Sequence, residues 1–239
     1  MAAYVPQEEN LYQSFALESG TFMACPHVSG IVALLKVLHP SWSPAAIRSA
    51  LATTASTIDP SGEPIFTVEE PQQVANPFHY GNGIVNPNQA ADPGLIYDMG
   101  MTEYVHYLCY IGYSESYTHS IVCPGKKPSM LNLNLPSITI PNLRGSIMVT
   151  RTVTNVGPVD STYVASIAHP LGVIVEVKPP KLAFNSTIKK LSFTITLSSN
   201  HKVIGGYYFG RLNWSDGIHM VTSPISVRTE IIPSYTDRF

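Results

Sequence analysis

From Leu131 to about Ile232, apolar and polar residues alternate with a period of two. The clearest run is 191–197, where Leu191, Phe193, Ile195 and Leu197 are separated by Ser192, Thr194 and Thr196. The same alternation recurs in 163–167, 173–177 and 225–229. Successive side chains of a strand point to opposite faces, so this pattern predicts strands with one buried face. Roughly seven short strands predict an antiparallel β-sandwich over 131–232, with 233–239 as a tail.

The dipeptide Asp216-Gly217 separates two of these runs, 207–214 and 218–227. An Asp-Gly pair between two strands favours a tight turn, because both residues accept positive φ angles. It therefore predicts a β-hairpin with a two-residue turn.

The N-terminal part of the chain has helical signals instead. Residues 23–38 are apolar on nearly every face, with Lys36 near the end, which predicts a helix buried in a larger core. Ser43 followed by Pro44 is a typical helix start and predicts a second helix. Residues 99–130 are expected to form a linker with a short helix over 102–110, for which Thr102 is the predicted N-cap.

Composition and charge argue against several classes of protein. Charged residues make up 13% of the chain and hydrophobic residues 44%, which is atypical of disorder. The formal net charge of −2 does not favour a nucleic-acid partner. The sequence has no uninterrupted run of about 18 apolar residues, so we expect no membrane span. Residues 1–14 are polar and carry no signal-peptide pattern. We expect no metal and no cofactor, because no metal-ligand spacing joins His106, His119, Cys109 and Cys123.

Three motifs in the first hundred residues point to one family. They are Gly20-Thr21-Phe22-Met23-Ala24-Cys25-Pro26-His27-Val28-Ser29-Gly30, the stretch from His39-Pro40-Ser41-Trp42 to Leu51, and the stretch from Gly83-Ile84-Val85-Asn86-Pro87 to Asp98. The first resembles the nucleophile motif Gly-Thr-Ser-Met-Ala-x-Pro-His-Val-x-Gly of subtilisin-like serine proteases (peptidase family S8). The other two resemble the plant-type, cucumisin-like members. Arg151-Thr152-Val153-Thr154-Asn155-Val156-Gly157 resembles the opening strand of their fibronectin-type-III-like domain.

The resemblance implies a fold class for the whole chain. We expect an α+β remnant of a subtilisin-like α/β catalytic domain in 1–98, the linker in 99–130, and an all-β fibronectin-III-like sandwich in 131–232. The chain would then be the C-terminal part of a serine-type endopeptidase.

One departure from the family motif concerns catalysis directly. Phe22 stands where the family carries its nucleophilic serine. A phenyl ring has no proton for a base to remove and no lone pair to attack a carbonyl. The family's Asp and His motifs precede the serine, and we expect them to be absent here. His27 matches the family's structural histidine, for which we expect a packing role. We therefore predict no catalytic residue and no activity for this chain as it stands; the alternative is a non-catalytic sandwich module for interaction or regulation.

The resemblance also implies several features outside the catalytic site. It pairs Cys109 with Cys123 in a disulfide, and Cys25 is then expected to be a buried free thiol. Asn185 and Asn213 begin glycosylation sequons. Members of the family act on polypeptide substrates outside the cell, in the apoplast. A full-length subtilase is a possible partner, and the location of this product itself is not predicted.

Overall fold

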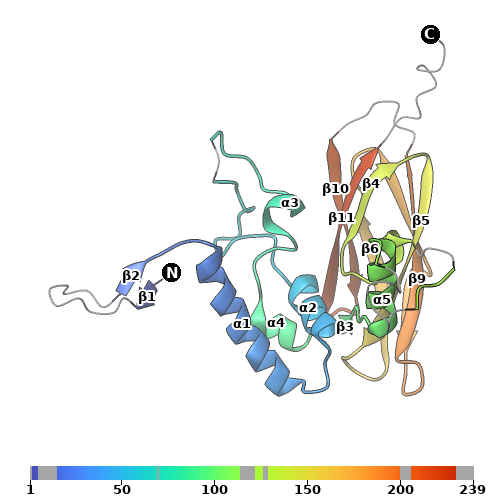
Figure 1. The fold of residues 1–239 in the computed structure, drawn as a ribbon, viewed down its shortest axis with the longest axis horizontal. Coiled ribbons are helices and arrows are strands. Elements are labelled where there is room, and N and C mark those ends of the chain that lie inside the picture. Colours follow the sequence, from blue (N-terminus) through green and yellow to red (C-terminus); the bar gives the residue numbers. More distant parts are fainter. Residues whose placement is uncertain are drawn as a thin grey trace, which may run out of the picture. The chain divides into compact units, whose positions relative to one another are not determined.

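The computed structural model describes residues 2–4, 15–68, 70–113, 122–125, 129–199 and 206–229. The chain divides into two parts, 1–42 and 43–239, which are described separately (Figure 1). In the first part, strands β1 (Ala2–Tyr4) and β2 (Phe15–Leu17) pair antiparallel, and helix α1 (Thr21–Leu38) follows.

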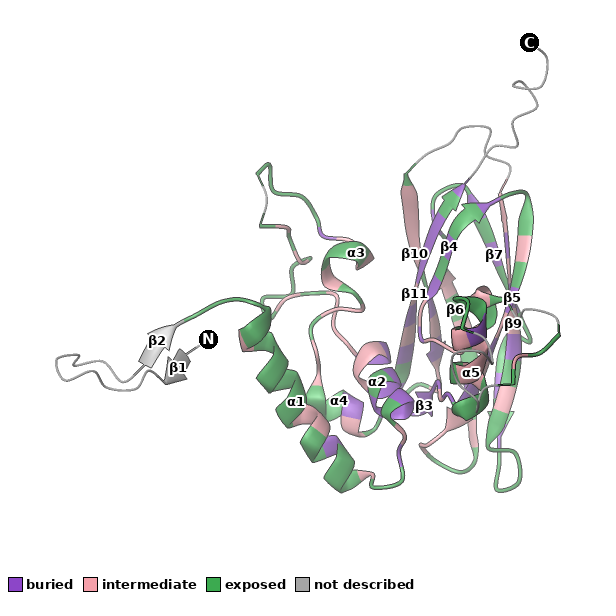
Figure 2. Cartoon of the chain, in the orientation of Figure 1, coloured by how far each residue is buried: buried purple, intermediate pink, exposed green. Residues whose placement is uncertain are grey.

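Helix α1 is exposed along almost its whole length, as Figure 2 shows. Leu35 is its one buried residue, so the larger core predicted around 23–38 is not seen among the described residues, and the burial predicted for Cys25 is wrong. The reason lies in the surroundings: among the described residues of 2–42, the only sheet is the two-stranded hairpin. By length and mean hydropathy, 1.6, α1 could cross a membrane, but core helices of soluble proteins meet the same test. The expected absence of a membrane partner stays a prediction.

The second part opens with helix α2 (Pro44–Thr53), which starts as predicted. The Ser43 hydroxyl accepts a hydrogen bond from the backbone N–H of Ala46 at 2.9 Å, and Pro44 occupies the first turn. Ser49 Oγ in turn accepts the backbone N–H of Tyr97 at 2.8 Å. Helix α2 packs against α4 (Pro87–Ala91) and against strand β11 (Met220–Thr229), with the short helix α3 (Pro77–Tyr80) between α2 and α4 in the chain.

The predicted sandwich is confirmed. One sheet has five strands in the order β4-β11-β10-β6-β8, and the other has four in the order β3-β5-β9-β7. The strands are β3 (Leu95–Ile96), β4 (Ile138–Leu143), β5 (Ser146–Asn155), β6 (Ser161–Ala168), β7 (Val173–Lys178), β8 (Lys181–Phe184), β9 (Lys190–Ser199) and β10 (Tyr207–Ser215). All neighbours pair antiparallel except β4 and β11, which are parallel.

The core of the sandwich is made by the residues whose alternation predicted it. Phe193, Ile195 and Leu197 are buried, whereas Thr194 and Thr196 between them are partly exposed. Buried residues of both sheets form one hydrophobic cluster. This cluster also contains Leu95 and Tyr97 from outside 131–232. The boundaries at 98, 130 and 232 stay predictions.

The linker helix starts earlier than predicted. Helix α5 spans Met101–Tyr110 and its N-cap is Gly100, so the assignment of Thr102 as the cap is wrong. Glu103 explains the difference, because its carboxylate accepts the backbone N–H of Gly100 at 2.9 Å. This is the bond that the third helical residue makes to the N-cap backbone in a capping box, and it marks Gly100 as the start of the helix.

The hairpin between β10 and β11 has a longer loop than predicted. Ser215 pairs with Met220, so four residues, 216–219, connect the strands instead of two. Asp216 Oδ1 accepts the backbone N–H groups of Ile218 at 2.9 Å and of His219 at 2.6 Å. These two bonds give acceptors to backbone N–H groups inside the four-residue loop, and a two-residue turn would not contain those groups.

Candidate functional site

The residue at the family's nucleophile position lies at the start of helix α1. Gly20 is the N-cap, and its carbonyl accepts the backbone N–H groups of Met23 at 3.0 Å and of Ala24 at 3.1 Å. Phe22 is the second residue of the helix, and 86% of its surface is exposed. A helix start of this kind can present a side chain, but the side chain here is a hydrocarbon ring.

No neighbour of Phe22 in this part of the chain forms a nucleophile–base pair among the described residues. His27 bonds through Nδ1 to the backbone carbonyl of Met23, at 2.7 Å, on the same helix. It is exposed, so the packing role predicted for it is not seen. Its described hydrogen bond is to its own helix backbone.

The two linker cysteines lie together at the end of helix α5. Cys109 and Cys123 form a disulfide with an S–S distance of 2.04 Å and a Cα–Cα distance of 5.7 Å. The bond closes a loop with a sequence separation of 14 residues. In the chain-entropy description a loop of this length contributes about 3 kcal/mol to the free energy of unfolding.

The two sequon asparagines occupy different environments. Asn185 is exposed in the loop after β8, where its Oδ1 accepts bonds from the backbone N–H groups of Thr187 at 2.9 Å and Ile188 at 2.8 Å. A sugar on Nδ2 would leave these bonds in place. Asn213 lies inside β10, paired on both sides, with its Oδ1 buried. Of the two, only Asn185 presents its amide on a loop.

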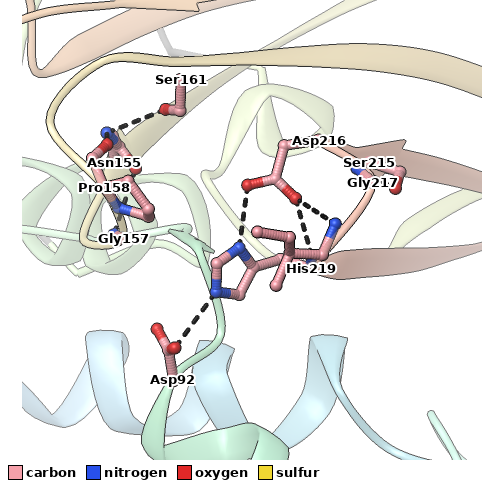
Figure 3. Close-up of polar contacts among 10 residues, drawn as sticks. Asp92, Asn155, Gly157, Pro158, Ser161, Ser215, Asp216, Gly217 and His219 are labelled. Atoms are coloured by element: carbon pink, nitrogen blue, oxygen red, sulfur yellow. Dashed lines mark hydrogen bonds and ion pairs between the residues drawn. The ribbon is translucent and has the colours of Figure 1, made fainter.

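One histidine lies between two carboxylates among the described residues (Figure 3). His219 Nδ1 lies 2.8 Å from Asp216 Oδ2 within the β10–β11 loop. Its Nε2 lies 3.2 Å from Asp92 Oδ2, at the C-terminal end of α4. The side chains of His219 and Asp216 are 7% and 8% exposed, whereas that of Asp92 is 71% exposed.

The environment of this cluster shifts its pKa values. Burial opposes charge on Asp216, but the hydrogen bonds from the ring and backbone of His219 outweigh it and lower the pKa of Asp216 to about 2. Burial likewise opposes charge on His219, and the interactions with Asp216 and Asp92 outweigh it, so the pKa of His219 is raised. Burial and the two nearby carboxylates raise the pKa of Tyr163.

No local pattern in the sequence predicted this cluster. Asp216 was assigned only to a turn, and nothing in the local pattern links Asp92 with His219, which lie far apart in the chain. The one available signal is Gly94, two residues after Asp92. Its φ is +74°, and a Cβ there would lie 2.8 Å from His219 Cβ and 2.5 Å from the Tyr163 hydroxyl. A glycine is therefore required for the backbone to approach the ring this closely.

Comparison with known protein families gives two matches along the chain. Residues 2–83 match the subtilase family (peptidase S8), and residues 132–227 match a fibronectin type-III domain. The two matches agree with the α+β segment and the sandwich, in the order predicted.

Curated relatives show the same similarity over nearly the whole chain. It is 53% identical to subtilisin-like protease SBT3.2 of Arabidopsis thaliana over 99% of its length. It is 54% identical to SBT3.6 and 56% identical to SBT3.10 from the same plant, over 94% and 93% of its length. The chain covers 33%, 30% and 30% of these three proteins, so it spans about a third of the relatives it matches.

Proposed function

Because this chain belongs to the subtilisin-like protease family, we propose that it carries the nucleophile helix and sandwich of such a protease without hydrolysing peptide bonds itself. The single observation that carries the proposal is Phe22, at the family's serine position. The family reaction, hydrolysis of polypeptides, begins with attack of the serine oxygen on the scissile carbonyl. Phe22 has no atom that can make this bond.

The surroundings of Phe22 support the proposal further. Thr21 and Ser19 flank it, but a displacement of one residue turns a hydroxyl away from the direction that the serine would take. The exposed phenyl ring also places bulk where the scissile carbonyl would lie. Both obstacles lie at the position itself and persist whatever other residues a longer chain would add.

The test uses an active-site fluorophosphonate probe and casein as substrate. We expect neither covalent labelling of the 239-residue chain nor casein turnover above the blank. The matched control is full-length SBT3.2 with its nucleophilic serine replaced by phenylalanine, which isolates the effect of this one side chain. It should lose activity on the order of 10⁶-fold, the loss found for the serine of subtilisin. Labelling of our chain, or activity retained by the control variant, would overturn the proposal.

We also propose an extracellular location for the product. A disulfide such as Cys109–Cys123 persists in oxidising compartments and is rare in the cytosol. A secretory route would expose Asn185 to glycosylation in its loop. Asn213 is half-buried within strand β10, which pairs on both sides, so its sequon is less accessible in the folded chain than that of Asn185.

A second candidate function is that of a non-catalytic interaction module. It is favoured because the sandwich core includes neither Phe22 nor any other residue of α1. The core cluster draws on both sheets and on Tyr97, and none of its members lies on helix α1. In this alternative the chain binds an intact subtilase and changes its activity. Purified chain added to SBT3.2 should then co-elute with it and alter its casein turnover. Separate elution with unchanged turnover would contradict this function and leave the first unaffected.

A further inference from the structure

We propose that the imidazolium of His219 is a pH-dependent clip that holds residues 92–94 on the sandwich. The ring lies between two carboxylates from different elements: Asp216 in its own loop and Asp92 at the end of α4 (Figure 3). The clip acts on stability and docking within residues 43–239, independently of the proposed lack of catalysis.

The geometry distinguishes the two protonation states of the ring. A carboxylate oxygen only accepts, and both ring nitrogens face one, at 2.8 Å and 3.2 Å. The imidazolium is hydrogen-bonded to Asp216 through Nδ1 and attracts Asp92 as an ion pair through Nε2, which makes no hydrogen bond in this arrangement. Neutral imidazole keeps one N–H, so with Nδ1 donating to Asp216 the lone pair of Nε2 faces the Asp92 carboxylate. Loss of one proton therefore removes an attraction and adds a repulsion at the same contact.

The two arms of the clip differ in strength. Asp216 is buried and also accepts two backbone N–H groups, so it fixes the ring within the loop. Asp92 is 71% exposed, so water and salt weaken its attraction for the ring. The Asp92 arm is the part that responds to conditions, and it is the one that reaches the segment being held.

The described groups that face the ring come from three elements. Asp216 lies on the loop, Asp92 follows α4, and the Tyr163 hydroxyl comes from β6. Gly94 and Gly157 lie against the ring, where a Cβ would come within 2.8 Å and 3.5 Å of its atoms. Because these groups pack closely around the ring, the described charged groups that face it are the carboxylates of Asp216 and Asp92.

The held segment is also joined to the sandwich by backbone bonds. The carbonyl of Gly94 accepts the backbone N–H of Val156 at 2.9 Å and of Gly157 at 3.1 Å. Strand β3 then pairs with β5. Exchange of the Val156 amide hydrogen therefore reports whether this segment is docked or open, since Gly94 is its described backbone partner.

The pH dependence follows from the direction of the shift. The pKa of His219 is higher in the folded state, so its stabilisation is complete below the unfolded value of about 6.5 and is lost as pH rises through the raised value. The pKa of Asp216 is lowered to about 2, so its contribution is complete above about 3.9 and is lost as pH falls toward 2. Docking is therefore strongest between about pH 4 and 6.5.

The experiment measures amide-exchange protection of Val156 in the full chain from pH 5.5 to 8.5, corrected for the intrinsic exchange rate. The protection factor should fall by about tenfold for each unit by which the pKa of His219 exceeds its unfolded value. The amide of Ile195, in the central strand β9, serves as an internal reference and should not change. Added salt should reduce the fall by screening Asp92.

Variants make the assignment specific. His219→Gln keeps a donor group and an acceptor group but carries no charge at any pH, so it should show the wild-type high-pH protection throughout. Asp92→Asn should remove most of the pH dependence, and His106→Gln, a histidine on α5, should leave it intact. If His219→Gln does not fold, nitrogen NMR of the wild-type ring decides: the proposal requires a titration midpoint above 6.5. A midpoint at or below 6.5, or Val156 protection independent of pH, would overturn it.

Discussion

Replacing Phe193 by alanine should lower the free energy of unfolding by about 4 kcal/mol. Phe193 is fully buried between the sheets, in edge-to-face contact with Trp214 at 5.0 Å and with Tyr97 at 6.5 Å between ring centroids. Truncation removes the buried ring and leaves a cavity that packed neighbours fill only in part. Denaturant unfolding followed by tryptophan fluorescence gives the measurement, because Trp214 lies beside the altered site.

The matched control for this variant is Ile174→Ala on the edge strand β7. Ile174 is 58% exposed, so its truncation should change the free energy of unfolding by no more than about 0.5 kcal/mol. Equal losses from both variants would mean that Phe193 does not form the centre of a packed core.

Arg151→Met should cost about 3–5 kcal/mol, a second large effect with a different cause. The buried guanidinium donates to four backbone carbonyls, those of Leu131, Ser137, Leu135 and Thr150, at 2.7–3.1 Å. It thereby ties the segment before β4 to the start of the sandwich. Methionine fills a similar volume but leaves those carbonyls without their donor, and each buried group without a partner is costly.

Two further variants separate the charge of Arg151 from its shape. Arg151→Lys keeps the charge but presents its donors from one point, so it cannot reach four carbonyls and should lose about 2 kcal/mol. Arg211→Met removes an exposed arginine that bonds Thr57 at 3.2 Å, and should change stability by no more than about 0.5 kcal/mol. If Arg151→Met unfolds at the wild-type denaturant concentration, water must replace the guanidinium at the carbonyls.

Local patterns predicted much of the fold because the responsible interactions lie within a few residues. A period of two determines which face of a strand is apolar, and this alone located the buried residues of β7 and β9. The start of α2 followed from Ser43 and Pro44, since capping acts within one helical turn. The family was likewise identified from contiguous motifs, and the replacement at Phe22 is visible in a single letter.

The expectations that failed depend on contacts from elsewhere. The apolar pattern of α1 showed that the helix has surface to bury, but burial requires a covering element, and the hairpin beside it in the chain is too small. The four-residue β10–β11 loop differs from the predicted turn because Asp216 bonds the loop backbone and the His219 ring. Such choices between turn types are settled by whichever side chains can reach the backbone in three dimensions.

The amino-acid sequence by itself determined the alternating strands, the start of α2 at Ser43 and the residue at the nucleophile position, since each follows from neighbours along the chain. The tertiary structure alone decided that Asp92 meets His219 and that Arg151 serves four carbonyls. Long-range pairs of this kind form only when the sheets have brought distant segments together, and no periodicity records them.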